Sequence, residues 1–357
     1  MVKLLIQPQD GIKALLTAIK QSKKTIEIVI FRFDRAEIEQ ALKKAVKRGV
    51  SVSALIAYAN HGGEKHLRKL EMRLLEAGVT VSRTPDILVR YHNKMMIVDG
   101  RVLYVLSFNF THLDIDHSRA FGIVTRKPKL VREARKLFAA DSHRKVYKAR
   151  QATFIVSPVN ARKELAAFIG KAEKQLLIYD PNIADPEMAR AIVNRAKAGV
   201  KVRVIGRMSR KHDNIDVRKL AGLRLHTRTI IRDGGDAFVG SQSLRKVELD
   251  KRREVGVIVR GRKTLGRMVD TFEADWSSKE LSDTPEADAK DLKRAVKEAA
   301  AELSPLSPLV KEAVREVVDK AGGDDLDAGE MHATIGKAVK EAVRERVQEI
   351  MNESGDQ

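Results

Sequence analysis

Apolar residues in the first 285 positions alternate between stretches with helical spacing and short runs rich in aliphatic side chains. Residues 12–19 and 36–47 have the helical spacing, which predicts two helices, the second ended by Gly49. Residues 26–31 and 50–56 are typical of buried strands. Strands that alternate with helices of this length predict βαβ units and a largely parallel sheet. Further short strands are predicted at 94–98, 102–106 and 121–125.

The same pattern occurs twice in the chain. Residues 5–56 resemble residues 155–206 at a constant offset of 150. From His92, which matches His226, the offset is 134, because the first half is 16 residues longer between the two matched blocks. This duplication predicts an α/β protein of two repeated mixed-sheet α-β-α halves, packed as a pseudo-dimer about an approximate two-fold axis. The predicted halves span residues 1–150 and 151–285.

The chain changes character after residue 285. Residues 286–357 are rich in alanine and in charged residues, and they contain three helical patterns separated by Ser304-Pro305 and Gly322-Gly323. We expect a charged helical tail that is an appendage or a partly disordered end; a partner-binding or oligomerising helix is the alternative. The predicted helices span 288–303, 308–321 and 330–350.

Net charge separates the body of the chain from this tail. The formal charge is +20 overall, but it is −6 in residues 286–357 and +26 in residues 1–285. A basic body predicts a polyanionic partner, either nucleic acid or an anionic phospholipid surface. Lysines scattered over the surface for solubility are the alternative, since a sequence does not show which charges cluster in space.

Cysteine and long apolar runs are both absent from the sequence. The lack of cysteine excludes disulfides, thiolate metal sites and cysteine nucleophiles. No run approaches the roughly 20 apolar residues of a membrane span, and the first residues lack the apolar core of a signal peptide. We therefore expect a cytoplasmic protein without a transmembrane segment.

A histidine and a cation two residues apart stand at matched positions of the two repeats. His92 precedes Lys94 in the first half, and His226 precedes Arg228 in the second. Residues two apart on a strand point to the same face, so each pair can approach one phosphate. The cation would neutralise phosphoryl oxygens while the imidazole attacks phosphorus. One such pair is a weak signal, but its recurrence with matched polar residues beyond it argues against chance.

The spacing His92-x-Lys94-x4-Asp99, followed by Ser107 and Asn109, resembles the signature of the phospholipase D superfamily. The resemblance covers nearly all of residues 1–285 but not the tail. It implies two mixed α/β halves with one active site at their interface, so that no oligomer is required. It also implies a phosphodiester substrate, a phosphohistidine intermediate, and no metal or other cofactor.

The resemblance assigns a role to each matched residue. His92 would be the nucleophile, and His226 would be the general acid and base. Glu254 would orient His92 from the other half by accepting its Nδ1 proton, which fixes the tautomer. The remaining assignments are Lys94 and Arg228 to the phosphate oxygens, Asn109, Ser107, Ser241 and Ser243 to phosphate binding, and Asp99 and Asp233 to the structure of the motif loops.

Several positions depart from the family pattern and make the two half-sites unequal. The second half has Arg228 in place of lysine and Ser243 in place of asparagine. The first half has Leu106 in place of glycine, and Ala120 stands where the second half has Glu254. Mild asymmetry fits a division of labour between nucleophile and acid, and a weakened activity is the alternative.

Three functions are compatible with these residues. The basic body and the lack of a membrane span favour a nuclease or other nucleic-acid phosphodiesterase. A phospholipase D or cardiolipin-type enzyme acting on anionic phospholipid would use the same positive charge. A non-catalytic nucleic-acid-binding relative would keep the fold with a decayed second motif, and the intact His226 argues against it.

Overall fold

The computed structural model describes residues 2–58, 64–210 and 212–278. The chain divides into a compact unit, Met1–Leu281, and the remainder, Ser282–Gln357. The helices predicted for the tail therefore lie outside the described residues, as does the predicted boundary at residue 285. Within the described part of the chain, no helix is long and apolar enough to cross a membrane.

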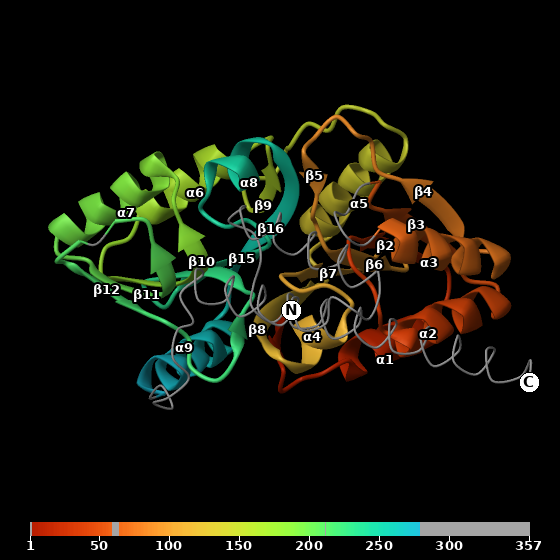
Figure 1. Ribbon diagram of the computed structural model, residues 1–357, viewed down its shortest axis with the longest axis horizontal. Helices are drawn as coiled ribbons and strands as arrows, with labels where there is room; N and C mark the ends of the chain where they lie inside the picture. The colour runs from red at the N-terminus through yellow and green to blue at the C-terminus, as the bar shows by residue number, and fades with distance from the viewer. Residues whose placement is uncertain (1, 59–63, 211, 279–357) are drawn as a thin grey trace, which may run out of the picture. The chain divides into compact units, whose positions relative to one another are not determined.

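The first half follows the predicted order of strands and helices (Figure 1). The helices predicted at 12–19 and 36–47 are confirmed, and the five predicted strands lie within a few residues of the observed ones. The elements are β1 (Val2–Gln7), α1 (Lys13–Gln21), β2 (Thr25–Ile30), α2 (Ala36–Lys47), β3 (Ser51–Ile56), α3 (Glu64–Glu76), β4 (Thr80–Arg83), β5 (Arg90–Tyr91), β6 (Met95–Val98), β7 (Val102–Leu106), α4 (His112–Asp116), β8 (Ser118–Thr125) and α5 (Pro128–Ser142).

The second half repeats this order except for one helix. Helix α3 has no counterpart among its described residues, which accounts for the change of offset between the two repeats. The elements are β9 (Phe154–Ser157), α6 (Ala161–Gly170), β10 (Gln175–Ile183), α7 (Pro186–Lys197), β11 (Lys201–Met208), β12 (Ile215–Arg218), β13 (Arg224–Leu225), β14 (Arg228–Arg232), β15 (Asp236–Gly240), α8 (Lys246–Asp250), β16 (Arg252–Arg260) and α9 (Arg262–Ser277).

Each half builds a mixed eight-stranded sheet. The orders are β1-β8-β7-β6-β2-β3-β4 with β13 added beside β8, and β12-β11-β10-β14-β15-β16-β5 with β9 added beside β16. Within a half, only β2-β3-β4 and β10-β11-β12 run parallel, so the predicted mixed sheet is confirmed and the expectation of a largely parallel one was wrong. The reason is that β6 and β7, and likewise β14 and β15, are joined by tight turns, which connect antiparallel strands without a crossover helix.

Each half also adds one short strand to the sheet of the other half. Strand β5 of the first half pairs in parallel with β16 of the second, at Arg90 with Arg252. Strand β13 of the second half pairs in parallel with β8 of the first, at Arg224 with Ser118. The two exchanges are equivalent under the repeat, so the halves form the expected pseudo-dimer with approximate two-fold symmetry.

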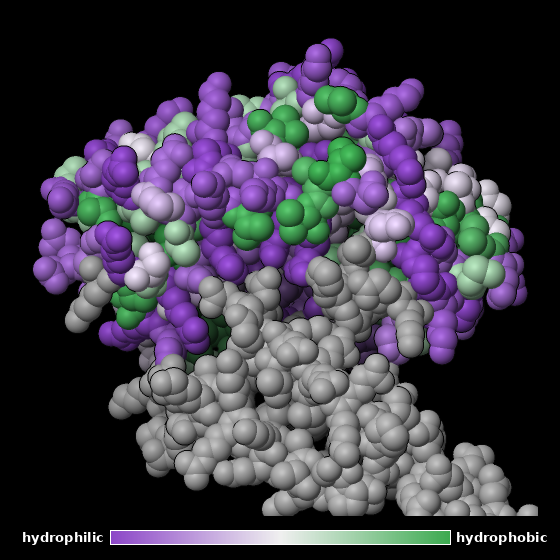
Figure 2. Space-filling model, turned by 45° about the horizontal axis from the view of Figure 1, so that its top comes forward, coloured by the Kyte–Doolittle hydropathy of each residue, from purple (hydrophilic) through white to green (hydrophobic). Residues whose placement is uncertain are grey.

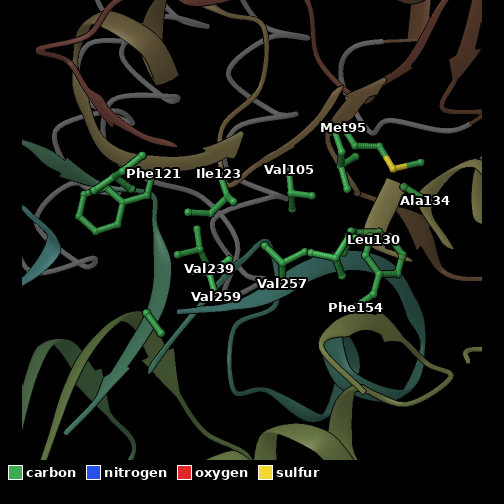
Figure 3. Packing of buried hydrophobic residues seen from close by; sticks show 14 of the residues in the cluster. Met95, Val105, Phe121, Ile123, Leu130, Ala134, Phe154, Val239, Val257 and Val259 are labelled. Atoms are coloured by element: carbon green, nitrogen blue, oxygen red, sulfur yellow. The ribbon is translucent and has the colours of Figure 1, made fainter. Parts of the chain in front are cut away.

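The largest apolar cluster contains residues from both sheets. Figure 3 shows Val105, Phe121 and Ile123 of the first half facing Val239 and Val257 of the second. The two remaining clusters each belong to one half, where helices α1, α2 and α3 or α6, α7 and α8 cover the other face of the sheet. Because both faces are buried, the strands are apolar on both sides, which explains why their sequences lack a simple polar alternation.

Two buried ion pairs cross between the halves at equivalent positions. Arg119 of β8 makes a bidentate pair with Asp275 of α9, at 2.7 and 2.9 Å. Arg253 of β16 pairs with Asp141 of α5 at 3.1 Å, and burial raises the pKa of that carboxyl to about 6. The hydroxyl of Tyr179 donates a further bond of 2.6 Å to Asp275. These pairs add directional contacts to an interface that is otherwise apolar.

We expect Asp275→Ala to destabilise the body by about 3–5 kcal/mol, because it leaves the buried guanidinium of Arg119 without its partner. The measurement is urea unfolding followed by circular dichroism. The matched control is Asp270→Ala on the exposed side of the same helix, which should change stability by roughly 0.5 kcal/mol or less. Equal stabilities of the two variants would contradict a role for the pair in joining the halves.

Candidate active site

Each motif histidine is held by the main chain of the opposite half. His92 directly follows β5, and its N–H donates to the carbonyl of Arg253 on β16 at 2.8 Å. His226 directly follows β13, and its N–H donates to the carbonyl of Arg119 on β8 at 3.0 Å. Both histidines are buried, with 8% and 7% of their surface exposed. The exchange of short strands therefore brings the two motifs to the interface between the halves.

The Nδ1 atom of His92 contacts the carboxylate of Glu254, with both carboxylate oxygens at 3.0 Å. Glu254 is fully buried on β16, so the sequence-based prediction that it orients His92 across the interface agrees with this geometry. The ring of Phe31 packs edge-on against the imidazole, with centroids 4.6 Å apart. The imidazole is thus fixed on two sides.

The electrostatic surroundings of His92 favour the neutral ring. Burial lowers the pKa of His92 well below its ordinary value, and Lys94 and Arg228 lower it further. Burial also raises the pKa of Glu254, although Lys94 opposes this. A neutral imidazole that donates its Nδ1 proton to Glu254 keeps an electron pair on Nε2, which is the atom a nucleophile needs.

The partner of His226 is Asp114, which sequence analysis missed. The Nδ1 atom of His226 lies 3.5 Å from Asp114 Oδ2. Asp114 also forms a buried ion pair with Arg224. Although burial acts to raise it, His226 and Arg224 hold the pKa of the Asp114 carboxyl well below its usual range. Asp114 therefore supplies the negative charge that Ala120, the counterpart of Glu254, does not.

A signal for Asp114 was present in the repeat. Asp114 matches Glu248 at the offset of 134, and both acids stand on the short helix after the motif. Each accepts a main-chain bond of 2.6 Å at the matched position, from Asn109 N–H in the first half and Ser243 N–H in the second. The acids thus share a structural role, and only Asp114 is observed to contact a histidine. Glu248 instead pairs with Arg252 at 3.4 Å.

The two motif cations make the same contact. Lys94 Nζ donates to the carbonyl of His92 at 2.5 Å, and Arg228 Nη1 donates to the carbonyl of His226 at 2.8 Å. Because β6 begins at Met95, Lys94 lies in the extended link before that strand and not on the strand as predicted. After burial, Arg228 is among the groups that lower the pKa of His92, and Lys94 among those that lower the pKa of His226. The motifs therefore share one site.

The polar residues assigned to phosphate binding divide into two groups. The amide of Asn109 donates to Asp114 at 2.7 Å, and its Oδ1 has no hydrogen-bond partner among the described residues. The hydroxyl of Ser243 donates to the buried carboxylate of Asp180, whose pKa burial raises to about 6. These two residues lie beside the acids of the site, and their contact with phosphate stays a prediction.

Ser107 and Ser241 form the second group. Neither serine has exposed surface. The hydroxyl of Ser107 accepts a bond of 2.9 Å from Phe121 N–H, and that of Ser241 accepts a bond of 3.2 Å from Val255 N–H. Both hydroxyls therefore hold the turn onto the next strand, and their contact with phosphate stays a prediction.

Asp99 and Asp233 shape the turns that end β6 and β14. Both have positive φ, at 53° and 52°. The Asp99 carboxylate accepts from three successive main-chain N–H groups at residues 23–25, and Asp233 does the same at residues 173–175. These bonds secure the start of β2 and β10 and match the structural role predicted for the two acids.

The departure at Leu106 also has a packing explanation. In the first half, the Leu106 side chain lies over Gly122, where an added Cβ would come within 2.8 Å of it. In the second half, the matched glycines Gly240 and Gly256 are instead covered by the ring of Phe238. Each half fills the same space from a different strand position, so the loss of the family glycine leaves the motif backbone in place.

The described residues contain no group of three or more His, Cys, Asp or Glu side chains arranged to hold a metal ion. What the site offers is two buried imidazoles, each next to a carboxylate, with a cation two residues beyond each imidazole. This set can form a covalent bond to phosphorus, neutralise phosphoryl oxygens and move a proton.

Comparison with known proteins agrees with this geometry. A family described as "Cardiolipin synthase, PLD-like domain" matches residues 15–142 and 165–276, one segment in each half. The chain is 30% identical over 128 residues to mitochondrial cardiolipin hydrolase of Danio rerio. The matched segment covers 35% of this chain and 53% of that protein. It is 23% identical over 332 residues to minor cardiolipin synthase ClsB of Bacillus subtilis (strain 168), covering 78% and 82%.

A solved structure supports the fold over both halves. The polyphosphate kinase from Porphyromonas gingivalis superposes with a TM-score of 0.65 at 18% identity, covering 84% of this chain and 55% of that one. The family match extends over more than half of the chain and includes both histidine motifs. The chain therefore belongs to the phospholipase D superfamily of phosphodiesterases, with the PLD-like domain repeated in its two halves.

Proposed function

We propose that the protein cleaves or transfers a phosphodiester through a phosphohistidine at His92. The observation that carries this proposal is the pairing of each imidazole with a carboxylate, Glu254 for His92 and Asp114 for His226. Nε2 of His92 would attack phosphorus, and the bond from phosphorus to the leaving oxygen would break as His226 gives that oxygen a proton. His226 would then remove a proton from water or an acceptor alcohol, whose oxygen displaces His92.

The starting protonation states follow from the charges around each ring. Burial and nearby cations favour neutral His92, as a nucleophile requires. Burial also lowers the pKa of His226, but Asp114 acts against this. An anionic phosphodiester bound between the rings would add negative charge and favour protonated His226. Substrate binding and acid catalysis are therefore coupled in this proposal.

For the substrate, we favour an anionic phospholipid over nucleic acid. Large apolar side chains are exposed just before the nucleophile, where 77% of Ile87 and 62% of Val89 are accessible. Tyr58, after β3, is 50% exposed. Tyr58 N–H bonds to Thr84 at 2.9 Å, which links its segment to the one that leads into His92. Exposed apolar residues next to basic ones suit the boundary between lipid headgroups and acyl chains. Figure 2 shows hydrophobic residues grouped among hydrophilic ones on one face.

The names of the relatives support the same substrate class. Cardiolipin appears in the names of both the hydrolase and the synthase that resemble this chain. Nucleic acid, which charge alone favours, is the second candidate, because residues 1–285 carry a net charge of +26. Positive charge serves either polyanion, whereas exposed aliphatic residues beside the site favour the lipid.

We expect His92→Asn to abolish both turnover and the covalent phosphoenzyme. His226→Asn should slow turnover by roughly 10²–10⁴-fold, and the phosphoenzyme should accumulate with a substrate whose leaving group needs no proton. The assay is hydrolysis of bis(4-nitrophenyl) phosphate in EDTA, with trapping of the acid-labile intermediate. His143→Asn, at an exposed helix end, is the control and should behave as the parent. Full activity of the His92 variant would refute the assignment.

Asp114→Asn should move the alkaline limb of the kcat profile to lower pH. The general acid is active only while protonated, and the aspartate charge acts to raise the pKa of His226. Removing that charge lowers the pH at which His226 loses its proton. The matched control is Glu248→Gln, which removes the charge of the equivalent acid, the acceptor of the Ser243 N–H bond, without altering a partner of His226. An unshifted alkaline limb in Asp114→Asn would show that Asp114 does not act through His226.

A competition experiment decides between the two substrates. Labelled nucleic acid and anionic phospholipid vesicles are offered together near physiological ionic strength, and binding and cleavage of each are measured. We expect the lipid to be bound and cleaved. Ile87→Ser with Val89→Ser should weaken vesicle binding about tenfold, because two apolar side chains no longer enter the bilayer. Val217→Ser, 40% exposed on β12, is the control. Cleavage of nucleic acid with the lipid left intact would favour the nuclease.

A further inference from the structure

Asp180 is a buried acid that the proposed reaction does not use. It lies on β10 with 2% of its surface exposed. Its carboxylate accepts from the main-chain N–H of Asn182 at 2.9 Å and from that of Leu244 at 2.8 Å. The hydroxyl of Ser243 bonds to the same carboxylate. Asp180 is therefore anchored both to its own strand and to the loop after β15, next to a serine that is predicted to bind phosphate.

The acid and the serine differ together between the repeats. Asp180 matches Ile30 at the offset of 150, and Ser243 matches Asn109 at the offset of 134. The first half therefore combines a buried aliphatic side chain with an asparagine, and the second half combines a buried carboxyl group with a hydroxyl. The half that has serine in place of the asparagine is also the half that has the acid beside it.

The number of hydrogen-bond donors explains why the serine needs this acid. The amide of Asn109 has two N–H donors, so one can bond to Asp114 while the other remains for a phosphate. A serine hydroxyl has only one donor. Ionised Asp180 can only accept, so it takes that donor and leaves no proton for an anionic oxygen. Protonated Asp180 can itself donate to Ser243 Oγ, and the serine O–H is then released for another acceptor.

The loop also offers an acceptor for the serine proton when no substrate is bound. The carbonyl oxygen of Asn182 lies 3.3 Å from Ser243 Oγ. This distance is long for a bond from a hydroxyl to an oxygen, so the contact is weak. A phosphoryl oxygen is a charged acceptor and forms the stronger bond. The serine proton can therefore move from the carbonyl to a bound phosphodiester without leaving a buried group unpaired.

The surroundings of Asp180 allow both protonation states near neutral pH. Burial raises the pKa of Asp180 to about 6, although the three hydrogen bonds that it accepts oppose this. The carboxylate of Glu248 on α8 faces Asp180 and raises the pKa further. A bound phosphodiester anion would add another negative charge and favour the protonated acid. The charged groups that act on Glu248 in turn are Arg228, Glu254 and Arg252.

We propose that Asp180 is a positioning residue for the phosphodiester: in the substrate complex, protonated Asp180 donates to Ser243 Oγ and so turns the serine O–H toward a phosphoryl oxygen. The proton comes from solvent, so an enzyme that is ionised at Asp180 takes up one proton as it binds the anion. The inference rests on the proposed function, because the phosphate must lie where Ser243 reaches it. The acid and the serine together then supply the donor that Asn109 supplies alone in the first half.

The test measures the affinity of the full chain for a phosphodiester whose own charge is constant. Dimethyl phosphate is a monoanion throughout the range from pH 5 to pH 8. Its inhibition constant is measured against cleavage of bis(4-nitrophenyl) phosphate, with samples quenched in alkali so that all the nitrophenol is ionised. Asp180 is neutral below about pH 6 and ionised above it, so wild type should bind more weakly as the pH rises. The expected loss is about tenfold, as for one hydrogen bond to a charged group.

Two variants separate positioning from a structural role, each compared with wild type at the same pH so that the titration of His226 cancels. Asp180→Asn carries an amide that donates to Ser243 Oγ at every pH, so it should bind about tenfold more tightly than wild type at pH 8. Ser243→Ala should bind about tenfold more weakly at pH 5 and equally at pH 8. Loss of a purely structural residue would not increase affinity. Asp216→Asn, exposed on β12, is the control and should follow wild type.

Two results would overturn the role of Asp180. The first is an Asp180→Asn variant that binds dimethyl phosphate no more tightly than wild type at pH 8. The second is a Ser243→Ala variant whose affinity relative to wild type is the same at pH 5 and pH 8, and this result decides the question if Asp180→Asn does not fold. Failure of the proposed function has a different signature, since wild type would then cleave no phosphodiester and form no phosphohistidine.

Discussion

The active site depends on the exchange of two short strands, β5 onto β16 and β13 onto β8. Each exchange carries a histidine directly after it, and the histidine N–H completes the pairing by bonding to the sheet of the opposite half. Neither imidazole would keep its place if the halves moved apart. The separation of the two halves is fixed by the apolar cluster between their sheets. It is also fixed by two ion pairs, Arg119–Asp275 and Arg253–Asp141.

The two half-sites reach the same arrangement, an imidazole beside a carboxylate, by different routes. Glu254 contacts His92 from the strand that also holds the main chain of His92. Asp114 reaches His226 from a short helix, while it also bonds to Asn109 and Arg224. This difference gives His226 and His92 separate electrostatic surroundings, as the separate roles proposed for them require.

Much of the fold could be predicted because the repeat shows each pattern twice. The helices at 12–19 and 36–47 and the histidine pairs followed from the repeat, and the contact from Glu254 followed from the resemblance to the phospholipase D superfamily. Three features could not be predicted. The direction of β6 depends on a turn at Asp99 and not on periodicity. The role of Asp114 required knowledge of which histidine its helix approaches. The burial of Ser107 is a property of packing, to which a matched serine in a motif gives no guide.

The inequality of the halves has a geometric consequence for any bound molecule. A site with true two-fold symmetry offers a ligand two equivalent orientations, and a reaction could then start from either end. Here Glu254 has Ala120 as its counterpart in the repeat, and Ser243 has Asn109. The two orientations therefore differ in energy, and the fused chain defines a head and a tail for its substrate. A dimer of identical halves could not make that distinction, because every change in one half would appear in both.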